Sequence, residues 1–455
     1  MTFKRWAFLL FLIGIILHIP LISLDNIWLD EQWTILSSRL TYGEVLKLIM
    51  TEDVQPPLYY LTAKTFFTLF GESILALRIL SLLGILALGG LALFPVRKLW
   101  GDKVALIFCM FALLAPYTFY LGLELRAYMW NTFFATAVFV FSVSVFRTNS
   151  PKDYFYLIFC SLAGLLTNYY VGLFIGLCWV ILFFRLVLRD KKYTRAIASF
   201  CISSFCVALL YLPWLFVFFE QWTRATDGSF WIQMDHVYQS LSVLYSGVFI
   251  NNGLIMTTMG FCWLSVLVFP FIRKKQYDFL IGLFLFIGII GFSFLYSYFI
   301  HPMLMWKYLV PFMGLFFLLC AISLQNVKKL PLCIFVVCFI LSTGNLFINM
   351  YQKVHHNGIK QMMTFIDNNV DDDTVIVANS AQSYFNLLYY LPHKNFAYFS
   401  EDRLFMNNHV KRLTPESTEK NFYIFSLLPQ KCMGELFMDM YFYPQYYCLT
   451  KIIVN

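Results

Sequence analysis

Two adjacent carboxylates, Asp30 and Glu31, lie between two tryptophans in the segment NIWLDEQWTI (26–35), soon after a long apolar run. Paired acids in such a place can provide a general base and a substrate ligand, bind an ion, or cap a helix that the pattern predicts to begin near Gln32. The residue types alone leave these alternatives open.

Other side chains that could bind a substrate or transfer a proton lie at the predicted external ends of membrane-spanning helices. These are Asp53, Gln55, Glu124, Arg126, Asn168, Tyr169, Tyr170, His301, Lys307 and Tyr308. Asp30, Glu31 and Asp53 could share a divalent ion, but their spacing does not require one, and no CxxC pair or His/Cys cluster has metal-site spacing. We therefore predict neither a metal ion nor a cofactor.

Membrane-spanning helices must position these side chains. Of the 455 residues, 60% are apolar and only 13% are charged, and a soluble domain cannot bury that much apolar surface. The predicted fold class is an α-helical polytopic membrane protein. Apolar runs of about 20 residues predict about eleven spans, at 6–24, 73–96, 103–121, 125–146, 154–168, 170–188, 196–219, 252–272, 279–300, 303–324 and 330–350. The first is predicted to stay uncleaved, because no small-residue cleavage site follows it.

Basic residues orient the predicted spans. With a cytoplasmic N-terminus, every cytoplasmic loop contains lysine or arginine, whereas the opposite loops contain few basic residues and many acids. The basic residues are Arg97, Lys98, Lys103, Arg147, Lys152, Arg185, Arg189, Lys191, Lys192, Arg195, Arg273, Lys274, Lys275, Lys328 and Lys329. The pattern predicts an external C-terminus and, in a bacterium, a location in the inner membrane. The net charge of +8 comes from these basic loops, so it does not indicate a nucleic acid as a partner.

Two external loops are long enough to form structure. The first, 25–72, predicts a helix in the interface plane over 33–50, a break at Pro56-Pro57 and a short helix over 58–70. The second, 220–251, predicts an interfacial helix over 236–249. No cytoplasmic loop is long enough to fold a nucleotide-binding domain, so any substrate must be presented externally.

The composition changes after residue 350. Residues 351–455 are polar, and strand patterns at 374–378, 422–427 and 449–454 flank a helical pattern at 383–391. We predict a transmembrane domain over 1–350 and a small external α/β domain over 351–455. Cys432 and Cys448 both lie in this tail, where a disulfide between them is one possibility.

Several short motifs resemble, in their order and sidedness, a known family. They are WLDEQW (28–33), EDVQPPLYYLTAKTFFTLFGES (52–73), ALRILSLLGILALGG (76–90), LFPVRKLWG (93–101), ELRAYMWNTFFA (124–135), TNYYVGLF (167–174) and WKYLVPF (306–312). Together they resemble the bacterial membrane glycosyltransferases of the C-type fold, in the family 39, protein-mannosyltransferase-like group that includes lipid A aminoarabinose transferases. The resemblance covers about residues 1–325.

The resemblance implies an inverting transfer of a sugar from a polyprenyl-phosphate donor to a glycan, lipid or protein acceptor on the external face. Asp30 matches the family's first-loop acid and would be the general base, with Glu31 assisting. Arg126, in Arg126-Ala127-Tyr128, and Lys307-Tyr308 match positions that would bind the donor phosphate, with Arg78 as a further candidate cation. The remaining candidates for substrate contact are Asp53, Gln55, Tyr128, Tyr169, Tyr170 and His301.

Two positions depart from the family pattern. Relatives carry His-Pro-Pro where this chain has Gln55-Pro56-Pro57, and Gln cannot act as an acid or a base. Lys307 replaces an arginine, which exchanges a bidentate phosphate ligand for a point charge.

Structural alternatives remain open for most of these residues. Arg126 could be an interface residue paired with Glu124, and Asp53 could form a turn. The tyrosines could belong to an aromatic belt, and His301 could be structural. At the level of the whole protein, the alternatives are a polymerase or ligase of lipid-linked glycans, a transporter and a non-catalytic receptor.

Overall fold

The computed structural model describes residues 2–22, 27–189, 194–226, 232–246, 253–272, 276–355, 358–398, 422–428, 435–439 and 445–452. The chain forms two compact units. The first contains Met1–Ile19, Val54–Thr62 and Arg78–Phe347, and the second contains Pro20–Asp53, Ala63–Leu77 and Ile348–Asn455. Each unit is described separately below.

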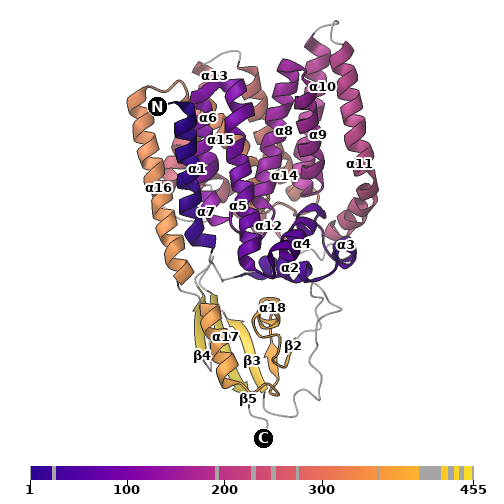
Figure 1. The fold of residues 1–455 in the computed structure, drawn as a ribbon, viewed down its shortest axis with the longest axis vertical. Coiled ribbons are helices and arrows are strands. Elements are labelled where there is room, and N and C mark those ends of the chain that lie inside the picture. The colour runs from indigo at the N-terminus through magenta and orange to yellow at the C-terminus, as the bar shows by residue number, and fades with distance from the viewer. Residues whose placement is uncertain are drawn as a thin grey trace. The chain divides into compact units, whose positions relative to one another are not determined.

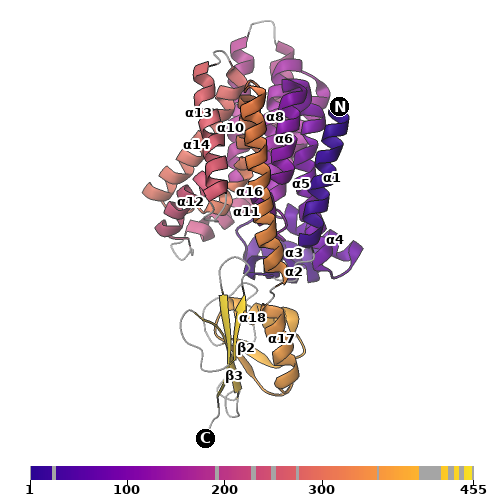
Figure 2. The ribbon, with the colours of Figure 1, turned by 90° about the vertical axis from the view of Figure 1, so that its left-hand side faces the viewer.

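Long helices make up most of the first unit and run side by side in both ribbon views (Figures 1 and 2). Its helices are α1 (Phe3–Ile22), α5 (Ile74–Gly90), η1 (Ala92–Val96), α6 (Arg97–Leu114), α7 (Pro116–Tyr120), α8 (Tyr128–Thr148), α9 (Pro151–Leu165), α10 (Tyr169–Arg189), α11 (Thr194–Thr226), α12 (Met234–Ser246), α13 (Gly253–Ile272), α14 (Tyr277–Phe299), η2 (Trp306–Tyr308), η3 (Val310–Phe312), α15 (Met313–Leu324) and α16 (Lys329–His355). Helices α4 (Leu58–Phe70), α5, α1 and α16 each run from one unit into the other.

Nine helical stretches of the described residues are long and apolar enough to cross a membrane. The difference from eleven predicted spans has two sources. Residues Ile74–Phe119 form one stretch of 46 residues, which at about 1.5 Å per residue is about twice the hydrocarbon thickness and so accommodates both predicted spans. It is interrupted at Gly101, whose φ of +87° is not helical. The predicted span at 154–168 forms α9, which has 15 residues and is too short to count.

Helix α15 forms the centre of the first unit. All of its residues are buried, and it contacts α6, α8, α13 and α14. Phe316 and Phe317 of α15 contact the rings of Trp263 and Phe111 on neighbouring helices. A side chain at Gly314 would collide with Thr136 on α8, so glycine is needed where these helices meet. The outer helices instead expose large apolar side chains such as Leu188 and Phe284, as expected for surfaces that face lipid.

The first loop forms three helices where two were predicted. The pattern over 33–50 predicts one helix, but the chain forms α2 (Leu29–Arg39) and α3 (Tyr42–Thr51). The break follows from a capping box: Glu44 N–H donates to Thr41 Oγ1, and the Glu44 carboxylate accepts from Thr41 N–H at 2.9 Å. The predicted helix over 58–70 matches α4. In the second loop, α12 begins at Met234, and residues 247–249 lie outside the described part of the chain.

The C-terminal part of the second unit is a mixed α/β sheet domain. Its five strands are β1 (Ile376–Ala378), β2 (Phe396–Tyr398), β3 (Phe422–Leu428), β4 (Glu435–Asp439) and β5 (Gln445–Ile452), in the order β2-β1-β3-β5-β4. β1 is parallel to β2 and β3, with Ile376 opposite Tyr423, whereas β5 is antiparallel to β3 and β4. Helices α17 (Gly358–Asn369) and α18 (Ala381–Tyr390) complete it.

The predictions for this tail were partly right. The strand patterns at 422–427 and 449–454 correspond to β3 and β5, and the pattern at 374–378 to the shorter β1. β2, β4 and α17 were not predicted; β2 has only three residues, too few for a strand pattern to show in the sequence. Cys432 lies outside the described residues, and Cys448 lies in β5.

Candidate functional site

The acidic pair lies in the first turn of α2, in the second unit. Helix α2 begins at Leu29, earlier than the predicted start near Gln32. Glu31 is fully buried, and its carboxylate accepts a hydrogen bond from the Trp28 N–H at 3.2 Å. Glu31 therefore caps the helix, a place where the exposed N–H groups and the helix dipole favour negative charge. Asp30 is half-buried in the same turn.

Asp53 is bonded to the same helix. The indole Nε1 of Trp33 donates to Asp53 Oδ2 at 2.8 Å, and the Asp53 side chain is buried. This bond fastens the end of the loop that precedes Pro56-Pro57 to the helix that carries the acidic pair.

In the first unit, Arg78 anchors the turn that carries the next candidates. Its side chain is completely buried, and Nη1 donates to the backbone carbonyl of Leu123 at 2.7 Å. Ser81, one turn later on α5, donates to the carbonyl of Glu124 at 2.6 Å. Because these two bonds hold residues 123 and 124 against α5, Arg78 positions the turn 121–127.

That turn presents a buried ion pair. Glu124 Oε2 lies 3.9 Å from Lys307 Nζ, and both side chains are almost fully buried. Lys307 also lies over the rings of Tyr128 and Trp306, with Nζ 5.8 and 5.6 Å from their centroids. Lys307 comes from η2, about 180 residues after Glu124 in the sequence, so folding alone brings the two charges together.

Arg126, two residues after Glu124, contacts a different element. Its Nη1 donates to the hydroxyl of Tyr60 at 2.9 Å, and its guanidinium carbon lies 5.8 Å from the Tyr60 ring centroid. Tyr60 belongs to α4, so Arg126 connects the turn 121–127 to the segment that follows Pro56-Pro57.

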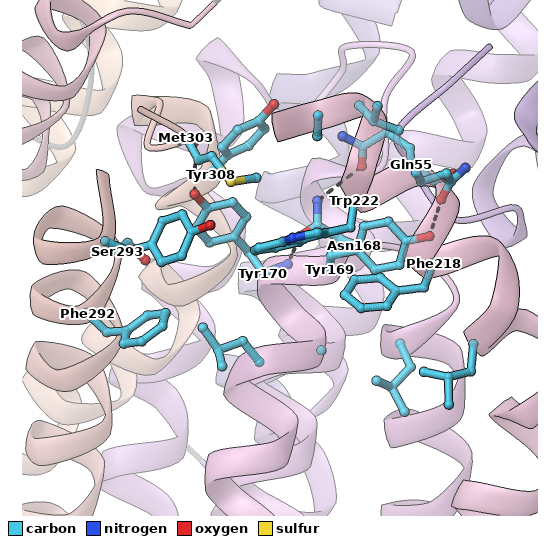
Figure 3. A pocket seen from close by; sticks show the side chains of 18 of the residues that line it. Gln55, Asn168, Tyr169, Tyr170, Phe218, Trp222, Phe292, Ser293, Met303 and Tyr308 are labelled. Carbon is cyan, nitrogen blue, oxygen red and sulfur yellow. Dashed lines mark hydrogen bonds between the residues drawn. The ribbon is translucent and has the colours of Figure 1, made fainter. Parts of the chain in front are cut away.

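A cavity of about 370 Å³ lies between α10, α11 and α14, and most of its wall is apolar (Figure 3). The lining residues are Val54, Gln55, Leu165, Asn168, Tyr169, Tyr170, Gly172, Leu173, Tyr211, Leu215, Phe218, Gln221, Trp222, Ala225, Phe292, Ser293, Tyr296, Met303 and Tyr308. Five residues singled out from the sequence therefore share one cavity: Gln55, Asn168, Tyr169, Tyr170 and Tyr308.

Hydrogen bonds hold the polar side of this cavity. Gln55 accepts from Asn168 Nδ2 at 3.4 Å through its side chain and from Gln221 Nε2 at 3.2 Å through its backbone carbonyl. Tyr169 donates to Gln221 Oε1 and accepts from the indole of Trp214. Gln55 thus acts as a neutral hydrogen-bonding residue.

The tyrosines on the other side of the cavity pack on each other. Tyr170 stacks on Tyr308 with ring centroids 5.0 Å apart, and its hydroxyl donates to the carbonyl of Met303 at 2.9 Å. His301, nearby in sequence, is half-buried and does not line this cavity. Because Tyr308 directly follows Lys307, η2 places one residue in the ion pair and the next in the cavity wall.

Sequence reasoning missed three of these contributors. Gln221 and Trp214 lie in α11, and Tyr60 lies in α4. Polar or aromatic residues in apolar helices are a weak signal, and only the fold shows that they bond to Gln55, Tyr169 and Arg126.

No family model and no curated protein matches the sequence. Solved structures do match. The crystal structure of ArnT from Cupriavidus metallidurans in the apo state superposes with a TM-score of 0.68 at 11% sequence identity, and the match covers 98% of each chain. The chain has an ArnT-like fold. The structure of the same ArnT bound to undecaprenyl phosphate matches with a TM-score of 0.64, also at 11% identity and over 98% of each chain.

This match confirms the fold predicted from the motifs, that of a C-type membrane glycosyltransferase. It extends further than predicted, because the motifs covered about residues 1–325 and the ArnT fold covers nearly the whole chain, the α/β domain included.

Proposed function

We propose that this protein is an integral-membrane glycosyltransferase that moves a sugar from a polyprenyl-phosphate donor to an acceptor on the external face of the membrane. The observation that carries the proposal is the ArnT-like fold over 98% of both chains, since one of those ArnT structures contains undecaprenyl phosphate. The mostly apolar cavity with one polar side supports it, because a lipid phosphate has the same division between an apolar chain and a polar head.

The donor needs cations near its phosphate. When the bond between the anomeric carbon and the phosphate oxygen breaks, the electron pair leaves with the polyprenyl phosphate, and negative charge accumulates there in the transition state. Arg126 and Lys307 are the proposed ligands of this phosphate. Arg126 belongs to the turn 121–127 of the first unit, and Lys307 is paired with Glu124 of the same turn. Tyr308 and Tyr170 would shape the adjacent cavity wall. Arg78 bonds to the backbone of the turn 121–127, so we assign it the role of positioning that turn.

The acceptor needs a base. Its hydroxyl oxygen attacks the anomeric carbon from the face opposite the phosphate, which inverts the configuration, and its proton passes to a carboxylate. We assign this role to Asp30. Glu31 accepts a hydrogen bond from the Trp28 N–H, and we assign it the role of stabilising the start of α2. The proposed acceptor is a glycan, a lipid or a protein, and the reaction requires no metal ion.

Replacement of Asp30 tests the mechanism. In purified protein reconstituted into lipid nanodiscs, Asp30→Asn is expected to lower transfer from polyprenyl-phosphate sugars by at least about 100-fold, the range expected for removal of a general base. Asp235→Asn, at an exposed acid in the first turn of α12, is the matched control and should retain full activity. Mass spectrometry of lipid-linked sugars in a strain without the protein would identify the donor as the species that accumulates. Wild-type activity in Asp30→Asn would refute Asp30 as the base.

A further inference from the structure

A buried amide pair connects α2 to the α/β domain within the second unit. Gln32 Nε2 donates a hydrogen bond to Asn386 Oδ1 on α18, although the two residues are 354 positions apart. Both side chains are completely buried. Gln32 directly follows the acidic pair, so the contact is made one residue from Glu31 and two from Asp30.

The buried amide pair leaves two polar groups without hydrogen bonds. Gln32 Oε1 and Asn386 Nδ2 are buried and have no hydrogen-bond partner among the described residues. Each such group has lost its hydrogen bonds to water without gaining a partner in the protein, which destabilises the folded state. An apolar pair of the same size would fill this space without that cost. A directional amide bond instead specifies one arrangement of the two helices, because only one register brings donor to acceptor.

Helix α18 is itself firmly held on the sheet. Its first turn is capped by Ser380, whose Oγ accepts from the Ser383 N–H at 3.2 Å. The ring of Tyr384 packs edge-on against Phe396 and Tyr398 of β2, with centroids 5.4 and 6.0 Å away. The position of Asn386 is therefore set by the sheet.

A second contact lies further along the two helices. The guanidinium of Arg39, seven residues after Gln32 on α2, lies 5.6 Å from the ring centroid of Tyr389 on α18. Residues seven apart lie on one helix face about two turns from each other. Two attachment points on one face restrict both the direction of α2 and its rotation about its axis.

Rotation of α2 matters because the acidic pair projects from it. A carboxylate lies about 5–6 Å from the axis of its helix, so a rotation of about 10° moves it by about 1 Å. A displacement of that size can cost about 100-fold in rate when a reacting group must be aligned. Trp33 also holds α2 through its hydrogen bond to Asp53. The Gln32–Asn386 bond lies next to the acidic pair and joins α2 to α18 of the α/β domain.

We propose that Gln32 and Asn386 are positioning residues, through which the C-terminal α/β domain orients α2 and so aligns Asp30 for proton transfer. The inference rests on the proposed function, in which Asp30 is the base. It gives the α/β domain a specific part in the reaction: its sheet and α18 act as the support for the catalytic helix.

An exchange of the two side chains tests this in the full-length protein in nanodiscs. Gln32→Asn shortens one side by a methylene and Asn386→Gln lengthens the other, so the double variant keeps the combined length and the amide bond. We expect each single variant to lower kcat at least about tenfold while the donor KM stays within about twofold, and the double variant to recover most of the loss. Rates are normalised to the monodisperse folded fraction. A double variant no faster than the slower single variant would overturn the proposal.

A second measurement does not depend on activity. Asn386→Leu removes the amide at similar volume and should accelerate amide hydrogen exchange across residues 29–39, whereas Asn368→Leu, at an exposed asparagine on α17, should not. Unchanged exchange in Asn386→Leu would refute the coupling. If the wild-type protein transfers no sugar, the proposed function fails, and the exchange data still decide whether Asn386 orders α2.

Discussion

The buried ion pair between Glu124 and Lys307 allows a quantitative prediction. Its charges are 3.9 Å apart, and the side chains are 0% and 9% exposed. At an effective dielectric constant of about 20 the attraction is about 4 kcal/mol. Removal of one partner leaves the other buried, for which losses of about 3–5 kcal/mol are typical, whereas removal of both leaves no uncompensated charge. Lys307→Met and Glu124→Gln are thus each expected to destabilise the protein by about 3–5 kcal/mol, and the double variant by clearly less than the sum.

Thermal unfolding of the purified protein in one detergent, followed by the loss of monodisperse protein, checks this cycle. The exposed pair of Arg97 and Asp102, 2.6 Å apart with side chains 40% and 57% exposed, is the control. Asp102→Asn should cost less than about 1 kcal/mol. Strictly additive losses in the Glu124/Lys307 cycle would refute the reasoning, because they would mean that the two charges do not interact. If Lys307 also binds the donor phosphate, the double variant regains stability but keeps a raised donor KM.

The remaining predictions concern separate parts of the chain. Arg126→Ala should raise the donor KM at least about tenfold and leave the acceptor KM within about twofold, because a charge-assisted bond to phosphate contributes about 1.5–3 kcal/mol; an unchanged donor KM would count against phosphate contact. In the α/β domain, the Lys394 ammonium beside Asp372 lowers the pKa of that carboxyl from its ordinary 3.8. The same bond raises the pKa of Lys394 above its ordinary 10.5. The pair's contribution to stability should therefore be complete between about pH 4 and pH 10, fall as acid protonates Asp372, and fall as base deprotonates Lys394. Asp372→Asn should remove the acid limb of a hydrogen-exchange profile of α17, and an unchanged profile would contradict this assignment.

The sequence determined the membrane class and most of the helices. Apolar run length is a local property, so each predicted span corresponds to a helix, even where two share the stretch Ile74–Phe119. The helix predicted over 33–50 is divided by the Thr41–Glu44 capping box, a short-range signal that the apolar pattern did not include. Tertiary contacts decide in the tail, where the three-residue strand β2 exists because β1 pairs with it.

In the candidate site, the sequence predicted which residues matter but not which residues they contact. It singled out Asp30, Arg126 and Lys307 by type and by resemblance, since charges are conspicuous in an apolar chain. It could not show that Glu124 faces Lys307, that Arg78 anchors their turn, or that Gln32 bonds to Asn386. These partners are between 45 and 354 residues apart. No local pattern encodes such pairings, because a buried polar group can be satisfied by any suitable residue that the fold brings within reach. Residue chemistry thus identified the candidates, and only the packing of helices and sheet decided their partners.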